Sequence, residues 1–183
     1  AKSEGIAAGE AAARAVLAAR ANDNSSPAQF YMPPPLPDPG KWQMTPGCPA
    51  AGGVFYQWRN VTPFGMRSPD QFRLGPPPSI TSIRYTRDLK ELEEVGAINS
   101  LERPQDRTDV ALFYAAASPV AVWNPVARQL SAADGKSLSE NARDLALLNM
   151  AMSDGAVATF DTKYFYVTWR PETAIHFADM DGN

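Results

Sequence analysis

Apolar residues recur every three or four positions in several segments of the chain, the spacing that places them on one face of an α-helix. In the segment 81–96, for example, Ile83, Leu89, Leu92 and Val95 are interspersed with charged residues. The pattern predicts helices over 2–21, 81–96, 104–118, 122–133 and 137–169, with a short further turn over 172–178. We therefore predict an all-α fold, a helical bundle.

The segment 137–169 predicts the longest helix, which we expect to be central. Ser137 and Glu140 have the spacing of a capping box at its start. Pro171 disfavours helical geometry at Arg170 and should end the helix there. The apolar stripe expected to face the core consists of Leu138, Leu145, Leu148, Met152, Ala156 and Phe160.

A proline-rich segment separates the first predicted helix from the others. Of the 17 prolines, thirteen lie between Pro27 and Pro78. A disordered linker would lack aromatic residues, but here they are frequent. They are Phe30, Tyr31, Trp42, Phe55, Tyr56, Trp58, Phe64 and Phe72. We predict an N-terminal helix over 1–26, an ordered arm over 27–79 that wraps a helical body, and the helical portion over 80–183. The weaker alternative is that this segment is a ligand for proline-recognition domains. It lacks the repeated P-x-x-P spacing with flanking basic residues that such ligands have.

Composition excludes several classes of protein. The 183 residues carry 17 basic and 20 acidic side chains, a net charge of −3, with no run rich in Lys and Arg. We therefore expect no nucleic-acid partner. No apolar run approaches the roughly 18 residues of a membrane helix, so no membrane partner is expected. A single cysteine, Cys48, allows no internal disulfide, and a single histidine, His176, excludes a multi-histidine metal site within this chain.

Lys163 and Arg170 are the candidate functional residues. In one continuous helix they would share a face, about 10 Å apart along the axis. An ammonium and a guanidinium that converge on one point suit a tetrahedral or trigonal-bipyramidal oxyanion. The alternative is that both cations only satisfy the last carbonyls and the dipole of the helix.

The sequence from Lys163 to Pro171 has the form K-x6-R-P. This resembles the first of three motifs in the superfamily of vanadium-dependent haloperoxidases and type 2 phosphatidic acid phosphatases. The resemblance covers most of the chain. Within the superfamily, the sequence is similar to bacterial haloperoxidase-like members. It includes the segments 140–154, 169–175 and 179–183, the run Gly75–Pro78, and Trp42 with its neighbouring prolines.

The resemblance implies that Lys163 and Arg170 hold the non-bridging oxygens of vanadate or phosphate. In the intact enzyme vanadate would bind peroxide and oxidise a halide to a hypohalous species. The same cradle could instead serve phosphomonoester hydrolysis. The second motif, P-S-G-H, and the third, S-R-x5-H, do not occur in this sequence. His176 matches neither family histidine, and we expect it to be a structural or surface residue.

The two ends predict an internal piece of a longer protein. The chain begins at Ala1, almost directly with a helical pattern, and residues 180–183 form a turn signature. We expect the chain alone to be inactive. The remainder of the same polypeptide or a second chain would complete the site, and a homo-oligomer is possible. Export to the periplasm or outside the cell is implied by family resemblance alone. A non-catalytic helical assembly module is the third hypothesis.

Overall fold

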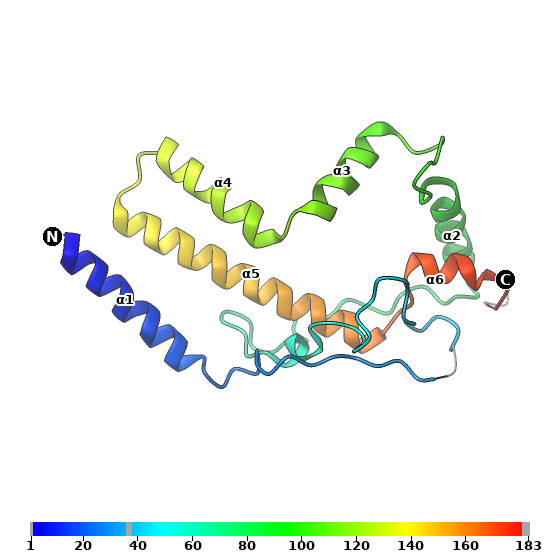
Figure 1. The fold of residues 1–183 in the computed structure, drawn as a ribbon, viewed down its shortest axis with the longest axis horizontal. Coiled ribbons are helices and arrows are strands. Elements are labelled where there is room, and N and C mark those ends of the chain that lie inside the picture. Colours follow the sequence, from blue (N-terminus) through cyan, green and yellow to red (C-terminus); the bar gives the residue numbers. More distant parts are fainter. Residues whose placement is uncertain (1, 36–37, 181–183) are drawn as a thin grey trace.

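The computed structural model describes residues 2–35 and 38–180 and is all-α, as predicted (Figure 1). Its helices are α1 (Lys2–Ala19), α2 (Ile83–Val95), α3 (Gln105–Ala116), α4 (Pro119–Ala133), α5 (Leu138–Tyr166) and α6 (Pro171–His176), with two 3-10 turns, η1 (Tyr56–Asn60) and η2 (Ala178–Met180). Within the described ranges the β pairing is limited to two isolated antiparallel bridges, Tyr31 with Gly53 and Lys41 with Thr168. The turn predicted over 180–183 lies almost wholly outside the described residues.

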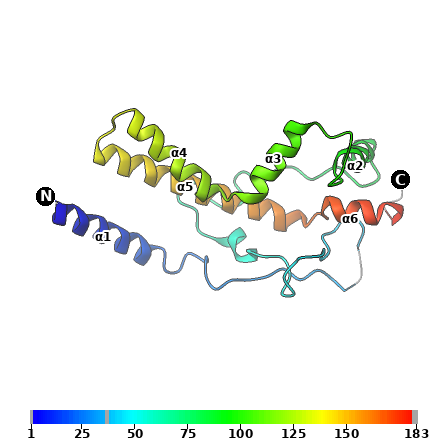
Figure 2. The same ribbon diagram turned by 45° about the horizontal axis from the view of Figure 1, so that its top comes forward.

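Helix α5 is the axis of the molecule (Figures 1 and 2). The predicted capping box is present: the Ser137 hydroxyl accepts from the backbone N–H of Glu140, and the Glu140 carboxylate accepts from the N–H of Ser137. The helix ends at Tyr166, however, and the prediction that it runs to Trp169 is wrong. Val167 adopts a left-handed conformation with φ 51° and ψ 42°, which ends the right-handed helix.

The arm provides the physical reason for this early end. The carbonyl of Val167 accepts from the N–H of Trp42 at 2.7 Å, and the N–H of Trp169 donates to the carbonyl of Gly40 at 3.0 Å. The segment after α5 therefore pairs with the arm in an extended conformation, and its backbone groups are not free to continue the helical ladder.

The second half of α5 is covered by the arm. Buried Asp154 accepts three backbone N–H groups of the arm, from Phe64 and Gly65 at 2.6 Å and from Met66 at 3.1 Å. Asp161 accepts from Nε and Nη2 of Arg73 at 2.7 and 2.8 Å.

Two tyrosines continue these connections toward the end of α5. The Tyr164 hydroxyl donates to the carbonyl of Val54, and the Tyr166 hydroxyl donates to that of Leu74. The buried side of α5 consists of Asp154, Val157, Asp161 and Tyr164. The predicted stripe is therefore not the buried side, and its first residue, Leu138, is 83% exposed. Hydrophobic periodicity missed the true side because half of that side is carboxylate.

The first half of α5 packs against α4. Side-chain amides of Asn124 and Asn149 donate to each other at 3.2 and 3.0 Å. Helix α4 begins at Pro119, three residues earlier than predicted, because the Ser118 hydroxyl accepts from the N–H of Ala121 and caps it there. Pro125 is accommodated inside the helix.

A separate small core joins α2 and α6. Leu89, Trp169 and Ala174 are buried together there. Ile83, predicted to share the inner face of α2, is instead 82% exposed.

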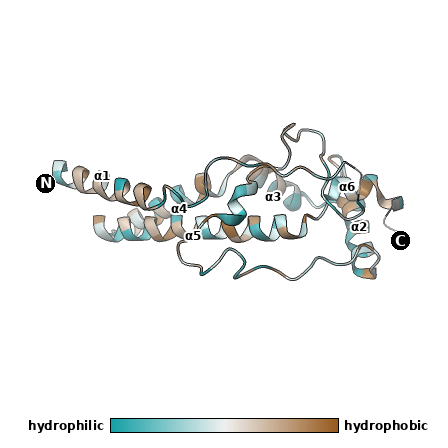
Figure 3. Cartoon of the chain, turned by 90° about the horizontal axis from the view of Figure 1, so that it is seen from below, coloured by the Kyte–Doolittle hydropathy of each residue, from teal (hydrophilic) through white to brown (hydrophobic). Residues whose placement is uncertain are grey.

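The helices do not close around one interior. The accessible surface is 12,803 Å², whereas a compact protein of this mass exposes about 8,600 Å². Apolar residues, brown in Figure 3, occur along the whole length of the molecule. Among the described residues no single helix is long and apolar enough to cross a membrane. Helices α3 and α4, which are bent by 98° at their junction, have sufficient length and apolar composition only when they are taken together.

Candidate functional site

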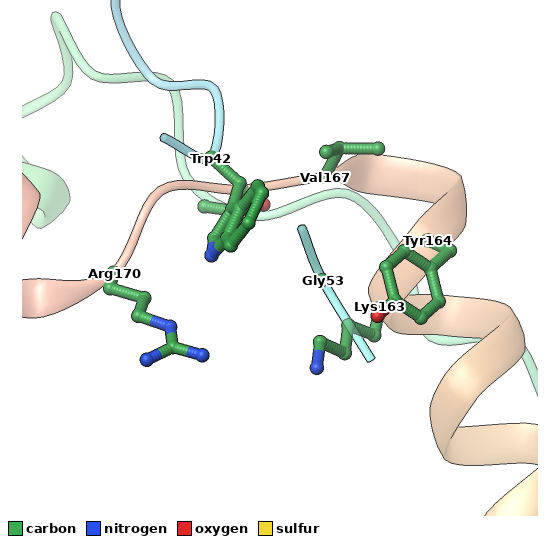
Figure 4. A pocket seen from close by; sticks show the side chains of 7 residues that line it. Trp42, Gly53, Lys163, Tyr164, Val167 and Arg170 are labelled. Atoms are coloured by element: carbon green, nitrogen blue, oxygen red, sulfur yellow. The ribbon is translucent and has the colours of Figure 1, made fainter. Parts of the chain in front are cut away.

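Lys163 and Arg170 line one pocket, although no continuous helix joins them (Figure 4). Lys163 lies in the last turn of α5, and Arg170 occupies the extended N-cap position of α6. The prediction that they share a helix face is wrong. They converge because the chain bends at Val167 and is then held straight against the arm.

The pocket concentrates positive charge. Among the described residues no carboxylate forms an ion pair with Lys163 or Arg170. Burial lowers the pKa of Lys163, and the positive charge of Arg170 lowers it further, while the neighbouring Cys48 acts in the opposite direction. The Lys163 ammonium also lies 5.0 Å from the ring centroid of Tyr164. The site therefore offers an uncompensated charge that an entering anion would neutralise.

A short hydrogen-bonded chain on the arm extends from Arg170. Nη1 of Arg170 donates to Oγ1 of Thr45 at 3.5 Å, and Oγ1 of Thr45 lies 3.4 Å from Sγ of Cys48. The hydrogen bonds from Thr45 lower the pKa of the Cys48 thiol, and the charge of Arg170 contributes in the same direction. Sequence reasoning missed both residues, since no local pattern connects positions 45–48 with position 170.

Five further residues line the pocket: Trp42, Gly53, Tyr164, Val167 and Thr168. Trp42 is only 6% exposed, and its indole Nε1 is buried with no hydrogen-bond partner among the described residues. A Cβ on Gly53 would lie 3.1 Å from Oη of Tyr164 and 3.6 Å from Cη2 of Trp42. Glycine thus permits the close approach of the arm to α5. The sequence predicts Trp42 as one of the aromatic residues of the ordered arm, with no link to Lys163 or Arg170.

The donors fit the oxygens of an oxyanion. An ammonium, a guanidinium and an indole N–H all donate, and none accepts. They suit the non-bridging oxygens of phosphate or vanadate. Within residues 2–35 and 38–180 no group of three His, Cys, Asp or Glu side chains could hold a metal ion.

His176 lies outside this pocket. It is exposed in α6 and lines a groove between α2 and α6 together with Leu92 and Glu93. The described chain therefore supplies cations and donors to the pocket, but no imidazole.

No protein-family model, no curated protein and no solved structure matches the chain.

Proposed function

We propose that this chain supplies the oxyanion-holding wall of a vanadium haloperoxidase-like enzyme. The observation that carries the proposal is the convergence of Lys163 and Arg170 on one pocket without a paired carboxylate among the described residues. The K-x6-R-P resemblance adds the type of oxyanion. A bound vanadate would supply the chemistry that activates peroxide toward a halide.

The residues of this chain bind and orient the anion. Lys163 contributes a point charge with three donors, and Arg170 contributes a planar fork. Tyr164, Trp42 and Val167 restrict water around them, which strengthens both charge-assisted contacts. The acid–base group and the nucleophilic or ligating group have no counterpart in this chain.

A second helical unit is the proposed source of those missing groups. It would come from the same polypeptide or from a second chain. Its support is the open surface, which exceeds that of a compact protein by about 4,000 Å². An interface that buries most of this excess has the size of an obligate one.

Anion binding is the first test. Isothermal titration of the chain with orthophosphate and with orthovanadate should show one site. Lys163→Met and Arg170→Met should each weaken binding about tenfold or more, because each removes a charge-assisted contact. Lys136→Met and Arg143→Met, which remove the same charges near the distant end of α5, are the matched controls. If wild-type chain binds neither anion, the proposal is wrong.

The reaction is tested on the protein with its complete site. Vanadate-dependent bromination that Arg170→Ala abolishes would support the haloperoxidase. Hydrolysis of a generic phosphate ester that vanadate inhibits would instead support the related phosphatase, whose transition state needs the same donors.

A non-catalytic assembly module is the second candidate. The uncovered apolar side chains of α3 and α4 favour it, among them Leu112 and Leu130, which are 64% and 60% exposed. Sedimentation of a stable assembly that binds no oxyanion would select this candidate over the enzyme.

A further inference from the structure

The indole N–H of Trp42 is an unused donor at the oxyanion pocket. Buried tryptophan N–H groups ordinarily find an acceptor. Here Nε1 is shielded and no described residue accepts from it. In Figure 4 the indole nitrogen lies on the edge of the ring nearest Arg170, beside the space between the two cations.

The position of Trp42 is rigidly determined. Its backbone N–H donates to the carbonyl of Val167, in the segment that separates Lys163 from Arg170. Its ring packs edge-on against Tyr31, with centroids 5.8 Å apart, and the absent side chain of Gly53 leaves room for it. Rotation of the ring to bring Nε1–H to another acceptor would therefore lose these contacts.

We propose that Trp42 is the third donor to the bound oxyanion, so that the arm is part of the binding site. The inference rests on the proposed function of Lys163 and Arg170 as anion-holding residues. A tetrahedral oxyanion such as phosphate or vanadate presents several oxygens in different directions, and one of them accepts from Nε1. The neutral N–H adds direction rather than charge, and it selects anions with an oxygen on that side.

Anion binding and arm docking are then coupled. An anion that contacts Trp42, Lys163 and Arg170 connects the arm, the end of α5 and the start of α6. Any ligand that binds only this docked arrangement stabilises it by mass action. Saturating phosphate should therefore slow amide hydrogen exchange at residues 40–42 and 167–169, which hydrogen bond to each other.

The test compares Trp42→Phe with wild type in titrations with orthophosphate and orthovanadate. Phenylalanine keeps an aromatic ring but removes the N–H, so affinity should fall about tenfold. Trp58→Phe is the matched control: Trp58 packs near Phe160 with centroids 6.4 Å apart and does not line the pocket. Its affinity should equal that of wild type.

A second measurement does not depend on the stability of the variant. In ¹H–¹⁵N spectra of wild-type chain, the Trp42 indole signal, assigned through its own backbone amide, should shift on addition of phosphate. The signals of Trp58 and Trp123 should not shift.

The possible failures are distinguishable. Wild-type chain that binds neither anion refutes the proposed function together with this inference. Binding that depends on Lys163 and Arg170, but is unchanged by Trp42→Phe and leaves the Trp42 indole signal in place, refutes only the role of Trp42.

Discussion

The two halves of α5 have opposite environments. From Asp154 onward the helix is covered by the arm, and its buried side consists of two carboxylates, a valine and a tyrosine. Before that point no residue of α5 is fully buried, and α4 is its main neighbour. The half that appears less hydrophobic in sequence is the half that is best packed.

The difference shows that polar side chains of α5 fix the arm at defined points, in addition to the packing of arm aromatic rings against Phe160 and Tyr164. Most of the arm lies outside helices and sheets, so its remaining backbone N–H groups need partners from elsewhere. Carboxylates and tyrosine hydroxyls on α5 satisfy or anchor that backbone at fixed points. The apolar residues of the other half are at most partly buried, with α4 as their neighbour, and their exposed parts are available for another surface.

Asp154→Ala, in the covered half of α5, should cause the largest loss of stability. It leaves three arm N–H groups without their acceptor, and we expect a loss of about 3 kcal/mol in the free energy of unfolding. Urea denaturation measures this loss. Asp144→Ala, in the open half, removes only the exposed pair with Lys136 and should cost less than about 1 kcal/mol. Equal effects would contradict the contrast between the halves.

Two glycine substitutions should change the free energy of unfolding in opposite directions. Gly52 has φ +104°, and a Cβ there would clash with the carbonyl oxygen of Tyr31, so Gly52→Ala should destabilise by about 2 kcal/mol. Gly155 has open space in mid-helix, and Gly155→Ala should stabilise by about 1 kcal/mol. Thermal unfolding monitored by circular dichroism distinguishes the two. Stabilisation by Gly52→Ala would show that the arm does not dock as described.

Truncation of apolar side chains sharpens the same comparison. Val157 is 0% exposed, and Val157→Ala should cost about 2 kcal/mol. Leu130 in α4 is 60% exposed, and Leu130→Ala should change the stability of the isolated chain by less than about 0.5 kcal/mol. A large loss at Leu130 in dilute chain would mean that this side chain is already covered in solution.

The smallest expected effect concerns pH. Because the pKa of Lys163 is lowered from its ordinary value of 10.5, the ammonium loses its proton before that pH is reached. Phosphate affinity should therefore decrease, a few-fold, as pH rises toward 10.5. Folding stability should increase over the same range, since the unfolded chain then binds more protons at this lysine than the folded chain.

The effect of Cys48 ionisation on anion binding must be separated from that of Lys163. Its thiol also loses a proton below its ordinary pKa of 9.0, and the resulting negative charge would weaken anion binding in the same direction. Calorimetric titrations of Cys48→Ser across the pH range isolate the part due to Lys163. A pH dependence that disappears in Cys48→Ser would assign it to the thiol instead.

The amino-acid sequence by itself determined the helical class, the capping box at Ser137 and the ordered character of the arm. These features depend on local signals: residue spacing, caps, and the positions of prolines and aromatic residues. It also identified Lys163 and Arg170 as partners, although for the wrong geometric reason.

Only the tertiary structure decided where α5 ends and which residues enclose the pocket. The left-handed turn at Val167 exists because the arm, more than a hundred residues earlier, hydrogen bonds with the segment that follows. The same pairing brings Trp42 to the cations. No periodicity in the sequence predicts a contact between segments so distant from each other. The contact consists of backbone hydrogen bonds, and these do not require particular side chains.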